Sequence, residues 1–252
     1  MKEKTPQKIR LNKYLAQWGD VSRRKADELI KKGDIFLNGS LVKNLGTFID
    51  PKKDHIRIKN KKILATQITP IYMMFNKPEN VLTTTKDPKN RLTVMDFIKK
   101  NKQRIFPVGR LDWNSEGLLL LTNDGDFSQK VLHPTYKIKK TYLVKIQGRP
   151  SPEQLKKLLK GVTTPIGKMK ASYVKKVPKT NPNNQWIKII IAEGKNRQIR
   201  HMFFKLGYRI LKLRRVAIGR LKLSRLKKGT YVLLKPADIE KVFINPKELS
   251  RR

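Results

Sequence analysis

The hydrophobic positions in the first quarter of the chain recur at helical spacing and then alternate. Two short helices are predicted where apolar residues lie three and four positions apart, and the Asn38-Gly39 pair that follows is a strong β-hairpin signal. Ser22 is a favourable N-cap for the second helix, and Gly33 suits the left-handed position after its end. The apolar positions are Leu11, Leu15 and Trp18, then Ala26, Leu29 and Ile30, and then Ile35, Leu37, Leu41 and Val42. Residues 8–68 are therefore predicted to form a small domain of two helices and a sheet.

Beyond an aperiodic stretch that ends at Pro70, predicted strands outnumber predicted helices. Strands are expected near residues 72–76, 105–110, 118–122, 141–147, 170–177, 186–192, 209–217 and 231–234, and helices near residues 94–100, 127–132, 152–160 and 197–206. This pattern is typical of an α+β domain with a mixed, mostly antiparallel sheet and peripheral helices. We assign residues 71–243 to this second domain, with a hairpin tip at residues 181–184, and residues 244–252 to a basic tail.

The charge of the chain indicates a polyanionic partner. Its 252 residues include 59 Lys or Arg and 19 Asp or Glu, which gives a formal net charge of +40. Nucleic acid is the main class of partner for such a charge, although part of the excess can serve solubility alone. An acidic lipid surface fits less well because no basic amphipathic helix stands apart from the folded pattern. No apolar run of about 18 residues and no apolar N-terminal signal occur, so we expect a cytoplasmic protein without a membrane partner.

The composition argues against several kinds of chemistry. The chain has no cysteine, which removes thiolate catalysis and zinc–thiolate sites. His55, His133 and His201 are scattered and lack the spacing of a metal site. The common glycine-rich signatures of dinucleotide and nucleotide binding are missing, which argues against an RNA methyltransferase. We therefore expect neither a metal nor a cofactor.

Cations are dense between the apolar positions of the first domain. Six of them are predicted to contact RNA phosphates, namely Arg10, Lys13, Arg23, Arg24, Lys25 and Lys31. A solvated helical face is the structural alternative for such a run. Residues 11–39 resemble the S4 RNA-binding domain in their order of helix, Ser-Arg-Arg turn, helix and Asn-Gly hairpin. That resemblance implies structured RNA as the partner without identifying a reaction.

A loop next to a leucine-rich strand carries the most informative acid. Residues 118–121 are four consecutive leucines, which predicts a strand buried on both faces. The loop before them contains Asp112, flanked by Arg110, in a chain that is poor in acids. Loops held by core strands often carry catalytic residues. An Asx-type hydrogen bond within a turn is the structural alternative for Asp112.

The segment GRLDWNSEGLLLLTNDG at residues 109–125 resembles the catalytic motif of the RsuA/RluB type of ribosomal-RNA pseudouridine synthase. Further elements of that family follow the same order, namely Asn76-Lys77-Pro78 with Thr83-Thr84, Lys140-Thr141-Tyr142, and the segment EGKNRQIRHMF at residues 193–203. Together with the S4-like region, the resemblance covers nearly the whole chain. It implies an isomerisation without a cofactor, in which the uridine glycosidic bond is cut and the ribose is rejoined to ring carbon five of the uracil.

Carried over by motif, the resemblance implies three catalytic residues. Asp112 would be the nucleophile, Arg200 would pair with it, and Tyr142 would pack against the target base. A carboxylate is ionised at neutral pH, but in a dry pocket it needs a fixed cation nearby to stay so. A phosphate-binding helix face is the alternative for Arg200, and a buried strand tyrosine is the alternative for Tyr142. Arg110 is expected to enter the space left by a flipped nucleotide, and Arg197 to contact the RNA backbone.

Two positions depart from the family pattern, because Asn80 stands where a glycine commonly follows the NKP sequence and Asn12 where the S4-like module often has Asp. The motif spelling favours large-subunit (23S) ribosomal RNA, or a pre-ribosomal particle, as the substrate. The same chemistry on small-subunit (16S) ribosomal RNA stays open, as does a non-catalytic ribosomal-RNA-binding or ribosome-assembly factor. A monomer is the simplest oligomeric state.

Overall fold

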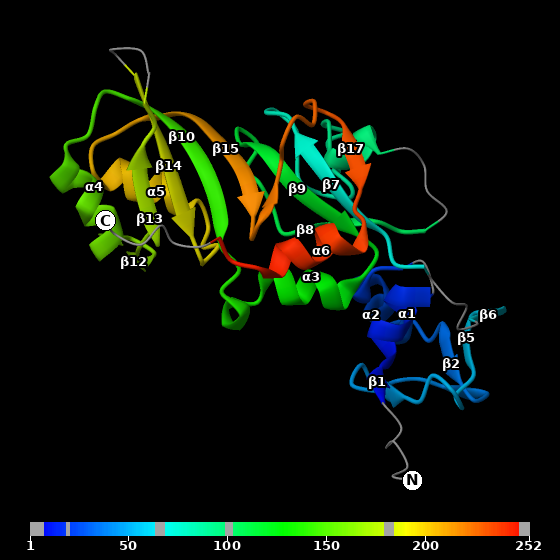
Figure 1. Cartoon of the computed structure of the whole chain (residues 1–252). Coiled ribbons are helices and arrows are strands. Elements are labelled where there is room, and N and C mark those ends of the chain that lie inside the picture. Colours follow the sequence, from blue (N-terminus) through cyan, green and yellow to red (C-terminus); the bar gives the residue numbers. More distant parts are fainter. Residues whose placement is uncertain (1–7, 19–20, 64–68, 99–102, 179–183, 247–252) are drawn as a thin grey trace, which may run out of the picture. The chain divides into compact units, whose positions relative to one another are not determined.

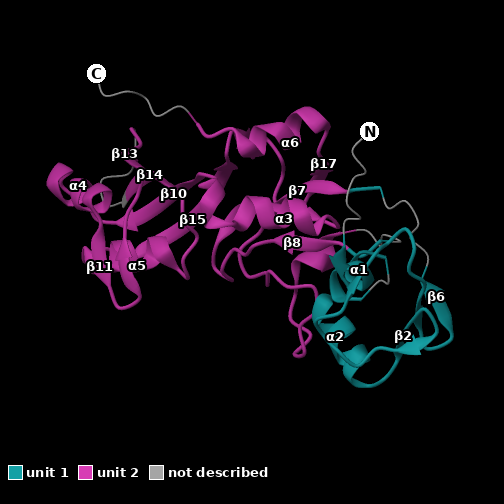
Figure 2. Ribbon diagram, turned by 90° about the horizontal axis from the view of Figure 1, so that it is seen from below, with its two compact units in different colours: residues 1–70, 101–104 teal, residues 71–100, 105–252 magenta. Residues whose placement is uncertain are grey.

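Contacts within the computed structural model divide the chain at Pro70. Unit 1 comprises residues 1–70 with 101–104, and unit 2 comprises residues 71–100 with 105–252 (Figures 1 and 2). The structure describes residues 8–18, 21–63, 69–98, 103–178 and 184–246. None of the helices in these ranges has both the length and the apolar character that crossing a bilayer requires.

Unit 1 consists of two helices and short strands around its own core. The elements are β1 (Ile9–Arg10), α1 (Leu11–Trp18), α2 (Arg23–Lys31), β2 (Ile35–Leu37), β3 (Ser40–Leu41), β4 (Phe48–Ile49), β5 (Ile56–Ile58) and β6 (Lys61–Ile63). The strands form a β1–β4 pair and an antiparallel sheet in the order β3-β2-β5-β6. The Ser22 hydroxyl accepts a hydrogen bond from the Lys25 N–H at 3.0 Å, and Gly33 has φ +75°, so the predicted start and end of α2 are confirmed.

Unit 2 is organised around one mixed sheet. Its strands are β7 (Tyr72–Lys77), β8 (Phe106–Val108), β9 (Glu116–Thr122), β10 (Lys140–Gln147), β13 (Tyr173–Lys176), β14 (Asn184–Ile191), β15 (Ile210–Ile218), β16 (Leu221–Lys222) and β17 (Tyr231–Leu233). Their order is β13-β14-β10-β15-β9-β7-β17, with β8 paired to β9 and β16 to β15. The β15–β9 pair is parallel and the other pairs are antiparallel. The predicted α+β class with a mostly antiparallel sheet is confirmed.

Helices and a small hairpin flank this sheet. They are η1 (Val94–Phe97), α3 (Gly125–Leu132), η2 (Pro134–Tyr136), α4 (Pro152–Lys160), β11 (Val162–Thr164), β12 (Gly167–Met169), α5 (Gln198–Lys205) and α6 (Pro236–Phe243). The capping box of Ser151 and Gln154, with Pro152 at the first turn, begins α4 at the predicted residue.

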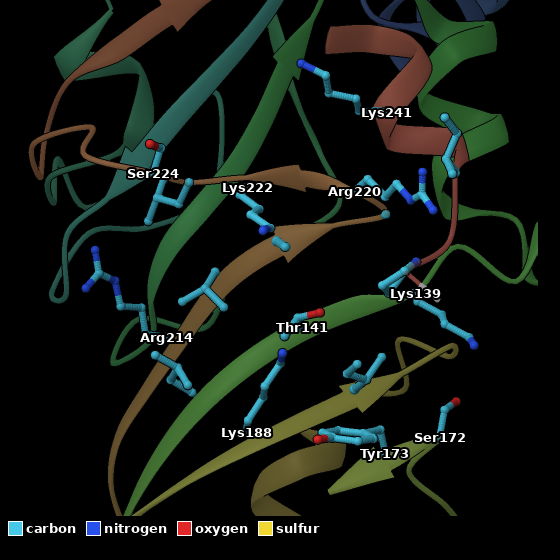
Figure 3. A pocket seen from close by; sticks show the side chains of 18 of the residues that line it. Lys139, Thr141, Ser172, Tyr173, Lys188, Arg214, Arg220, Lys222, Ser224 and Lys241 are labelled. Carbon is cyan, nitrogen blue, oxygen red and sulfur yellow. The ribbon is translucent and has the colours of Figure 1, made fainter. Parts of the chain in front are cut away.

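Hydrophobic side chains pack against both faces of β9. Leu119 and Leu121 belong to the cluster that includes α4 and α5, whereas Leu118 and Leu120 belong to the cluster that includes α3 and α6. All four leucines are at most 1% exposed, which confirms the prediction of a strand buried on both sides. Next to the part covered by α3 and α6, the same face of the sheet forms the floor of a cavity (Figure 3).

Some predictions about local structure were wrong or fall outside the described residues, and one helix was not predicted. The helix expected at residues 94–100 is a single turn, which begins at the Thr93–Asp96 capping box and ends at Ile98, where the backbone becomes extended. Helix α6 was not predicted, although Pro236 marks its first turn. The first residues of the expected basic tail contact unit 2, because the Asn245 side chain accepts a hydrogen bond from the Lys139 N–H at 3.0 Å. Residues 247–252 and the hairpin tip at residues 181–183 lie outside the described residues.

Candidate active site

The loop that carries Asp112 runs from the end of β8 to the start of β9 and turns at two glycines. Gly109 has φ +72° and Gly117 has φ +106°. Any larger side chain at Gly117 would overlap the carbonyl oxygen of Arg215 on the neighbouring strand. Both positions therefore require glycine, and β9 can approach β15 closely just where the loop ends.

Lys77, the last residue of β7, holds this loop from inside. Its side chain is fully buried, and its ammonium donates hydrogen bonds to the carbonyl oxygens of Ser115 at 2.8 Å, Pro78 at 2.9 Å and Asp112 at 3.2 Å. Burial lowers the pKa of Lys77 to about 8, and the nearby Asp112 carboxylate opposes that shift. A charged donor in the middle of carbonyl groups fixes the backbone from Asp112 to Ser115.

The segment after β7 holds the loop from its other side. The Thr83 hydroxyl donates to the Leu111 carbonyl at 2.8 Å and accepts from the Leu111 N–H at 3.3 Å. The Asn80 N–H donates to the Trp113 carbonyl at 2.8 Å, and Asn80 itself has φ +62°. Asparagine tolerates this left-handed conformation better than most residues, so the departure from glycine at this position leaves the turn intact.

Arg200 on α5 reaches the same loop and pairs with Asp112. Its Nε donates to Asp112 Oδ2 at 3.3 Å, and its Nη2 donates to the Asn114 carbonyl at 2.8 Å and to Ser115 Oγ at 3.1 Å. The Arg200 side chain is 14% exposed and that of Asp112 is 32% exposed. Burial lowers the pKa of Arg200 from its usual value, whereas the Asp112 carboxylate raises it. The predicted Asp112–Arg200 pair is thus present, and the acid is reachable from solvent.

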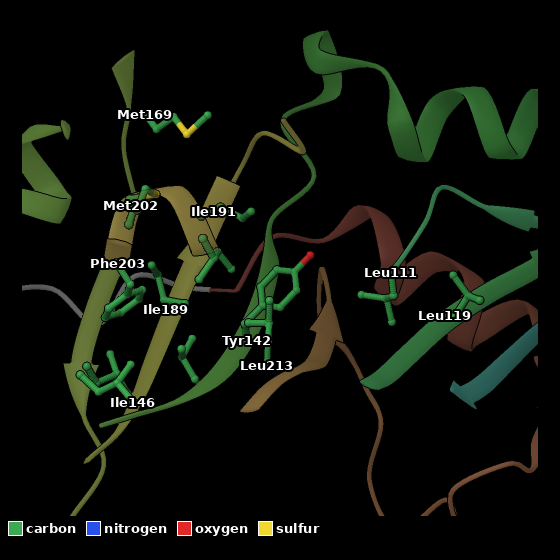
Figure 4. Packing of buried hydrophobic residues seen from close by; sticks show 14 of the residues in the cluster. Leu111, Leu119, Tyr142, Ile146, Met169, Ile189, Ile191, Met202, Phe203 and Leu213 are labelled. Carbon is green, nitrogen blue, oxygen red and sulfur yellow. The ribbon is translucent and has the colours of Figure 1, made fainter. Parts of the chain in front are cut away.

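Tyr142 lies on β10 at the edge of the hydrophobic cluster that also contains Leu111 and Leu213. Figure 4 shows its ring beside Leu213, with the hydroxyl on the side away from Leu213 and Ile189. Its hydroxyl accepts a hydrogen bond from Arg215 Nη1 at 3.5 Å, and among the described residues no hydrogen bond joins it to Asp112 or Arg200. The structure therefore joins two of the three predicted catalytic residues by direct contact and places Tyr142 in the adjoining core.

Arg215 was not predicted as a functional residue. It is 5% exposed, its Nε donates to the Leu118 carbonyl at 2.7 Å, and its Nη2 has no hydrogen-bond partner among the described residues. Lys140 lies two residues before Tyr142, and burial together with the charge of Arg215 lowers its pKa to about 8. Two buried cations next to one tyrosine are costly without an anion nearby, which makes this cluster suited to a negatively charged ligand.

The predicted RNA-binding side chains of unit 2 are exposed. Arg110 lies in the loop that carries Asp112, and Arg197 is the N-cap residue of α5, in a left-handed conformation with φ +46°. In unit 1, Arg10, Arg23, Arg24, Lys25 and Lys31 are exposed and Lys13 is half-buried. Lys25 is paired with Glu28 at 3.0 Å, and Arg10 lies over the Phe48 ring at 5.7 Å. These side chains are accessible to a polyanion, and their contacts with RNA stay a prediction.

The sequence contained a signal for some of the missed contacts. Lys77 and Thr83 lie in family motifs that the sequence analysis identified, but no role was predicted for either residue. Arg215 lies within the strand β15 and belongs to no such motif. Among the described residues no cluster of His, Asp or Glu has the arrangement of a metal site. The site therefore consists of one carboxylate, one arginine bonded to it, and a set of buried cations around the loop.

Comparison with known proteins gives matches over both units. Residues 71–205 match the RNA pseudouridylate synthase family, and residues 9–56 match the S4 domain. The chain is 39% identical over 234 residues to the ribosomal large subunit pseudouridine synthase B of Bacillus subtilis (strain 168), which covers 92% of this chain and 95% of that protein. It is 34% identical over 236 residues to an RNA pseudouridine synthase of Aquifex aeolicus (strain VF5), covering 93% and 94% of the two chains. A crystal structure of a pseudouridylate synthase has a TM-score of 0.65 and 27% identity, covering 93% of this chain and 99% of that one.

Proposed function

Because this chain belongs to the RNA pseudouridylate synthase family and carries an S4 domain, we propose that it converts a uridine of large-subunit (23S) ribosomal RNA to pseudouridine with Asp112 as the nucleophile. The chain is an enzyme, an isomerase that acts on RNA. The choice of large-subunit RNA follows from its 39% identity to the Bacillus subtilis enzyme, whose name specifies that substrate. The Asp112–Arg200 pair is the observation that carries the assignment of the nucleophile.

The carboxylate of Asp112 is arranged as a nucleophile should be. Arg200 binds its Oδ2, which leaves Oδ1 without a hydrogen-bond partner among the described residues. A guanidinium bonded to one oxygen offsets the cost of desolvating the negative charge when an RNA nucleotide displaces water from the loop. No separate base is needed, because a carboxylate is already deprotonated at neutral pH.

The reaction keeps every atom of the uridine. The glycosidic bond between ribose C1′ and uracil N1 is cut, the uracil turns while it is held, and C1′ is rejoined to ring carbon five. The proton that leaves carbon five is balanced by the proton that N1 gains. An isomerisation of this kind needs no co-reactant, so side chains can supply the catalysis. Asp112 would form the covalent link to the nucleotide, and the hydrogen bonds from Lys77 and Thr83 would keep its backbone in place through both steps.

Tyr142 is proposed to hold the uracil by stacking while it turns. Base–aromatic stacking contributes about 1–3 kcal/mol per base and permits rotation in the plane of the ring. The contact from Arg215 to the Tyr142 hydroxyl orients the ring. Arg110, exposed in the same loop as Asp112, is proposed to occupy the space left in the RNA when the nucleotide flips out.

Replacement of Asp112 by Asn tests the proposed nucleophile. The variant keeps the shape of the side chain and loses its charge, so we expect RNA binding to persist while pseudouridine formation falls by at least roughly a thousandfold. Asp126→Asn changes an exposed carboxylate on α3 and serves as the matched control. Product is measured on 23S and 16S ribosomal RNA separately by chemical mapping of pseudouridine.

Each outcome has a defined meaning. Undiminished product from Asp112→Asn would contradict the assignment of the nucleophile. Product on 16S RNA alone would replace the proposed substrate, and absence of product from the wild-type protein on either RNA would favour a binding or assembly factor.

A further inference from the structure

A cavity of about 1100 Å³ lies in unit 2, away from Asp112 (Figure 3). Its floor is the sheet face formed by β10, β14 and β15, and its wall includes β16 and α6. Side chains alternate between the two faces of a strand. Thr141 and Leu143 therefore point into the cavity, whereas Tyr142 between them points into the core beneath α5. The cavity and the proposed catalytic loop are on opposite faces of the β10–β14 part of the sheet.

This face is left open by the way the helices are distributed. Phe127 of α3 and Val242 of α6 pack against Leu118 and Leu120 of β9, so these helices cover the β7–β9 part of the sheet. Beyond them the floor of the cavity includes the apolar residues Leu143, Ile190 and Val216. An apolar floor of this kind is available for the face of a planar ligand.

The rim of the cavity is strongly basic. Its lining includes Lys139, Lys188, Arg214, Arg220, Lys222 and Lys241, against a single acid, Glu240. Some of these cations already have carboxylate neighbours, since Lys241 pairs with Asp238 at 2.8 Å and Arg214 lies 3.9 Å from Glu116. Lys188, Arg220 and Lys222 have no acidic partner within the part of the chain that the structure describes, and all three are exposed. These three are therefore available for an anionic ligand.

An aromatic ring completes the set of groups. Tyr173 on β13 is half-buried at the rim, and Lys188 Nζ lies 5.8 Å from its ring centroid. The hydroxyls of Thr141, Ser172 and Ser224 line the same space. Cations for phosphates, an aromatic face for a base and hydroxyls for sugar or base edges together match a single-stranded nucleic acid better than a peptide or lipid.

We propose that this cavity is a second RNA-binding site, which holds a single-stranded segment of the RNA substrate with its phosphates on Lys188, Arg220 and Lys222 and a base on Tyr173. The inference shares with the proposed function only the premise that the chain acts on RNA. A segment bound here does not compete with the nucleotide at Asp112, because the sheet separates the two. The site would thus increase the affinity of the protein for a large folded RNA. A short stem-loop, which cannot reach both sites, would not bind more tightly.

The charge contribution is tested with a triple variant, Lys188→Gln, Arg220→Gln and Lys222→Gln. Its control is Lys156→Gln, Lys157→Gln and Lys160→Gln, which removes the same charge from exposed positions of α4 on the other side of the sheet. The probe is a fluorescent single-stranded oligouridylate, titrated at several salt concentrations. Because the triple variant lacks three cations that would bind phosphates, we expect affinity to fall by roughly tenfold or more and the slope of log K against log salt to decrease in magnitude by about 2. The control triple variant is expected to change the slope by less than about 1.

The stacking contribution is tested at Tyr173. Tyr173→Ala is expected to weaken binding of the same probe by about tenfold, whereas Tyr173→Phe keeps the aromatic face and binds like the wild type. A probe that contains 4-thiouridine is expected to crosslink to peptides that include Tyr173 or Lys188, and thermal unfolding confirms that each variant is folded.

The proposal is overturned if the triple variant binds the probe with unchanged affinity and salt slope, or if no crosslink maps to the cavity. It is also overturned if an acidic peptide, but not RNA, protects these residues from modification, because the cavity would then serve a protein. Neither result bears on Asp112, whose role is tested by product formation.

Discussion

Lys77 shows how much of the proposed active site depends on one buried side chain. It is fully buried, yet it bonds to the backbone carbonyls of Asp112 and Ser115 and so acts as a charged anchor for the loop that carries Asp112. Arg200 bonds to the same loop from α5. Because both residues donate to the backbone or side chains of residues 112–115, the position of the Asp112 carboxylate is set by cations that come from distant parts of the chain.

Replacement of Lys77 by Met is predicted to destabilise unit 2 and to impair catalysis. The variant keeps the bulk of the side chain but leaves the carbonyls of Asp112 and Ser115 without their donor, which costs about 3 kcal/mol or more of the free energy of unfolding. Chemical denaturation measures that loss, and turnover at a temperature where the variant is folded measures the effect on the loop. A variant with wild-type stability and turnover would show that the loop does not need this anchor.

At the scale of elements, the pairing of β9 with β15 connects the loop that carries Asp112 to the Tyr142 region. The two strands run parallel, and Gly117 lies opposite Arg215 in their register. The close approach depends on the missing side chain of Gly117, and Arg215 in turn contacts the Tyr142 hydroxyl on β10. The spacing between the two strands therefore determines both the end of the Asp112 loop and the position of Arg215.

Gly117→Ala is predicted to be severely destabilising. The new methyl group would overlap the Arg215 backbone, and φ +106° is strained for any residue except glycine, so we expect a loss of at least about 3 kcal/mol. Gly125→Ala is the matched control, because nothing lies within 4 Å of an added Cβ at the start of α3. Thermal unfolding of both variants should separate them clearly. Equal melting temperatures would contradict the requirement for glycine at residue 117.

At the scale of the whole molecule, the chain has a net charge of +40, and within the described ranges two of its lysines, Lys77 and Lys140, are buried. Burial lowers the pKa of each from 10.5 to about 8. Between about pH 8 and pH 10 the unfolded chain therefore binds more protons than the folded chain, and the free energy of unfolding rises with pH. Below that window both states are protonated, and these lysines add no pH dependence.

The stability of unit 2 is thus predicted to increase from pH 8 to pH 10, with a contribution of up to about 3 kcal/mol from each buried lysine. Lys140→Met removes one contribution, so the gain across this window should be smaller in the variant. Calorimetric unfolding over the pH series measures both proteins. The net positive charge decreases with pH in both proteins alike. Parallel curves of unfolding free energy against pH would show that Lys140 has the same pKa in the folded and unfolded chains.

The limits of α2 and α4, the doubly buried leucine strand and the Asp112–Arg200 pair were all predicted from sequence. Helix caps and apolar periods act over a few residues, and the pair came from two recognisable motifs. The roles of Lys77 and Arg215, the uncovered face of the sheet and its basic cavity were decided by tertiary structure alone. Lys77 and Ser115, which are hydrogen-bonded, are 38 positions apart in the sequence, and Arg215 and Tyr142 are 73 positions apart. Contacts between residues so far apart form only after the strands have paired.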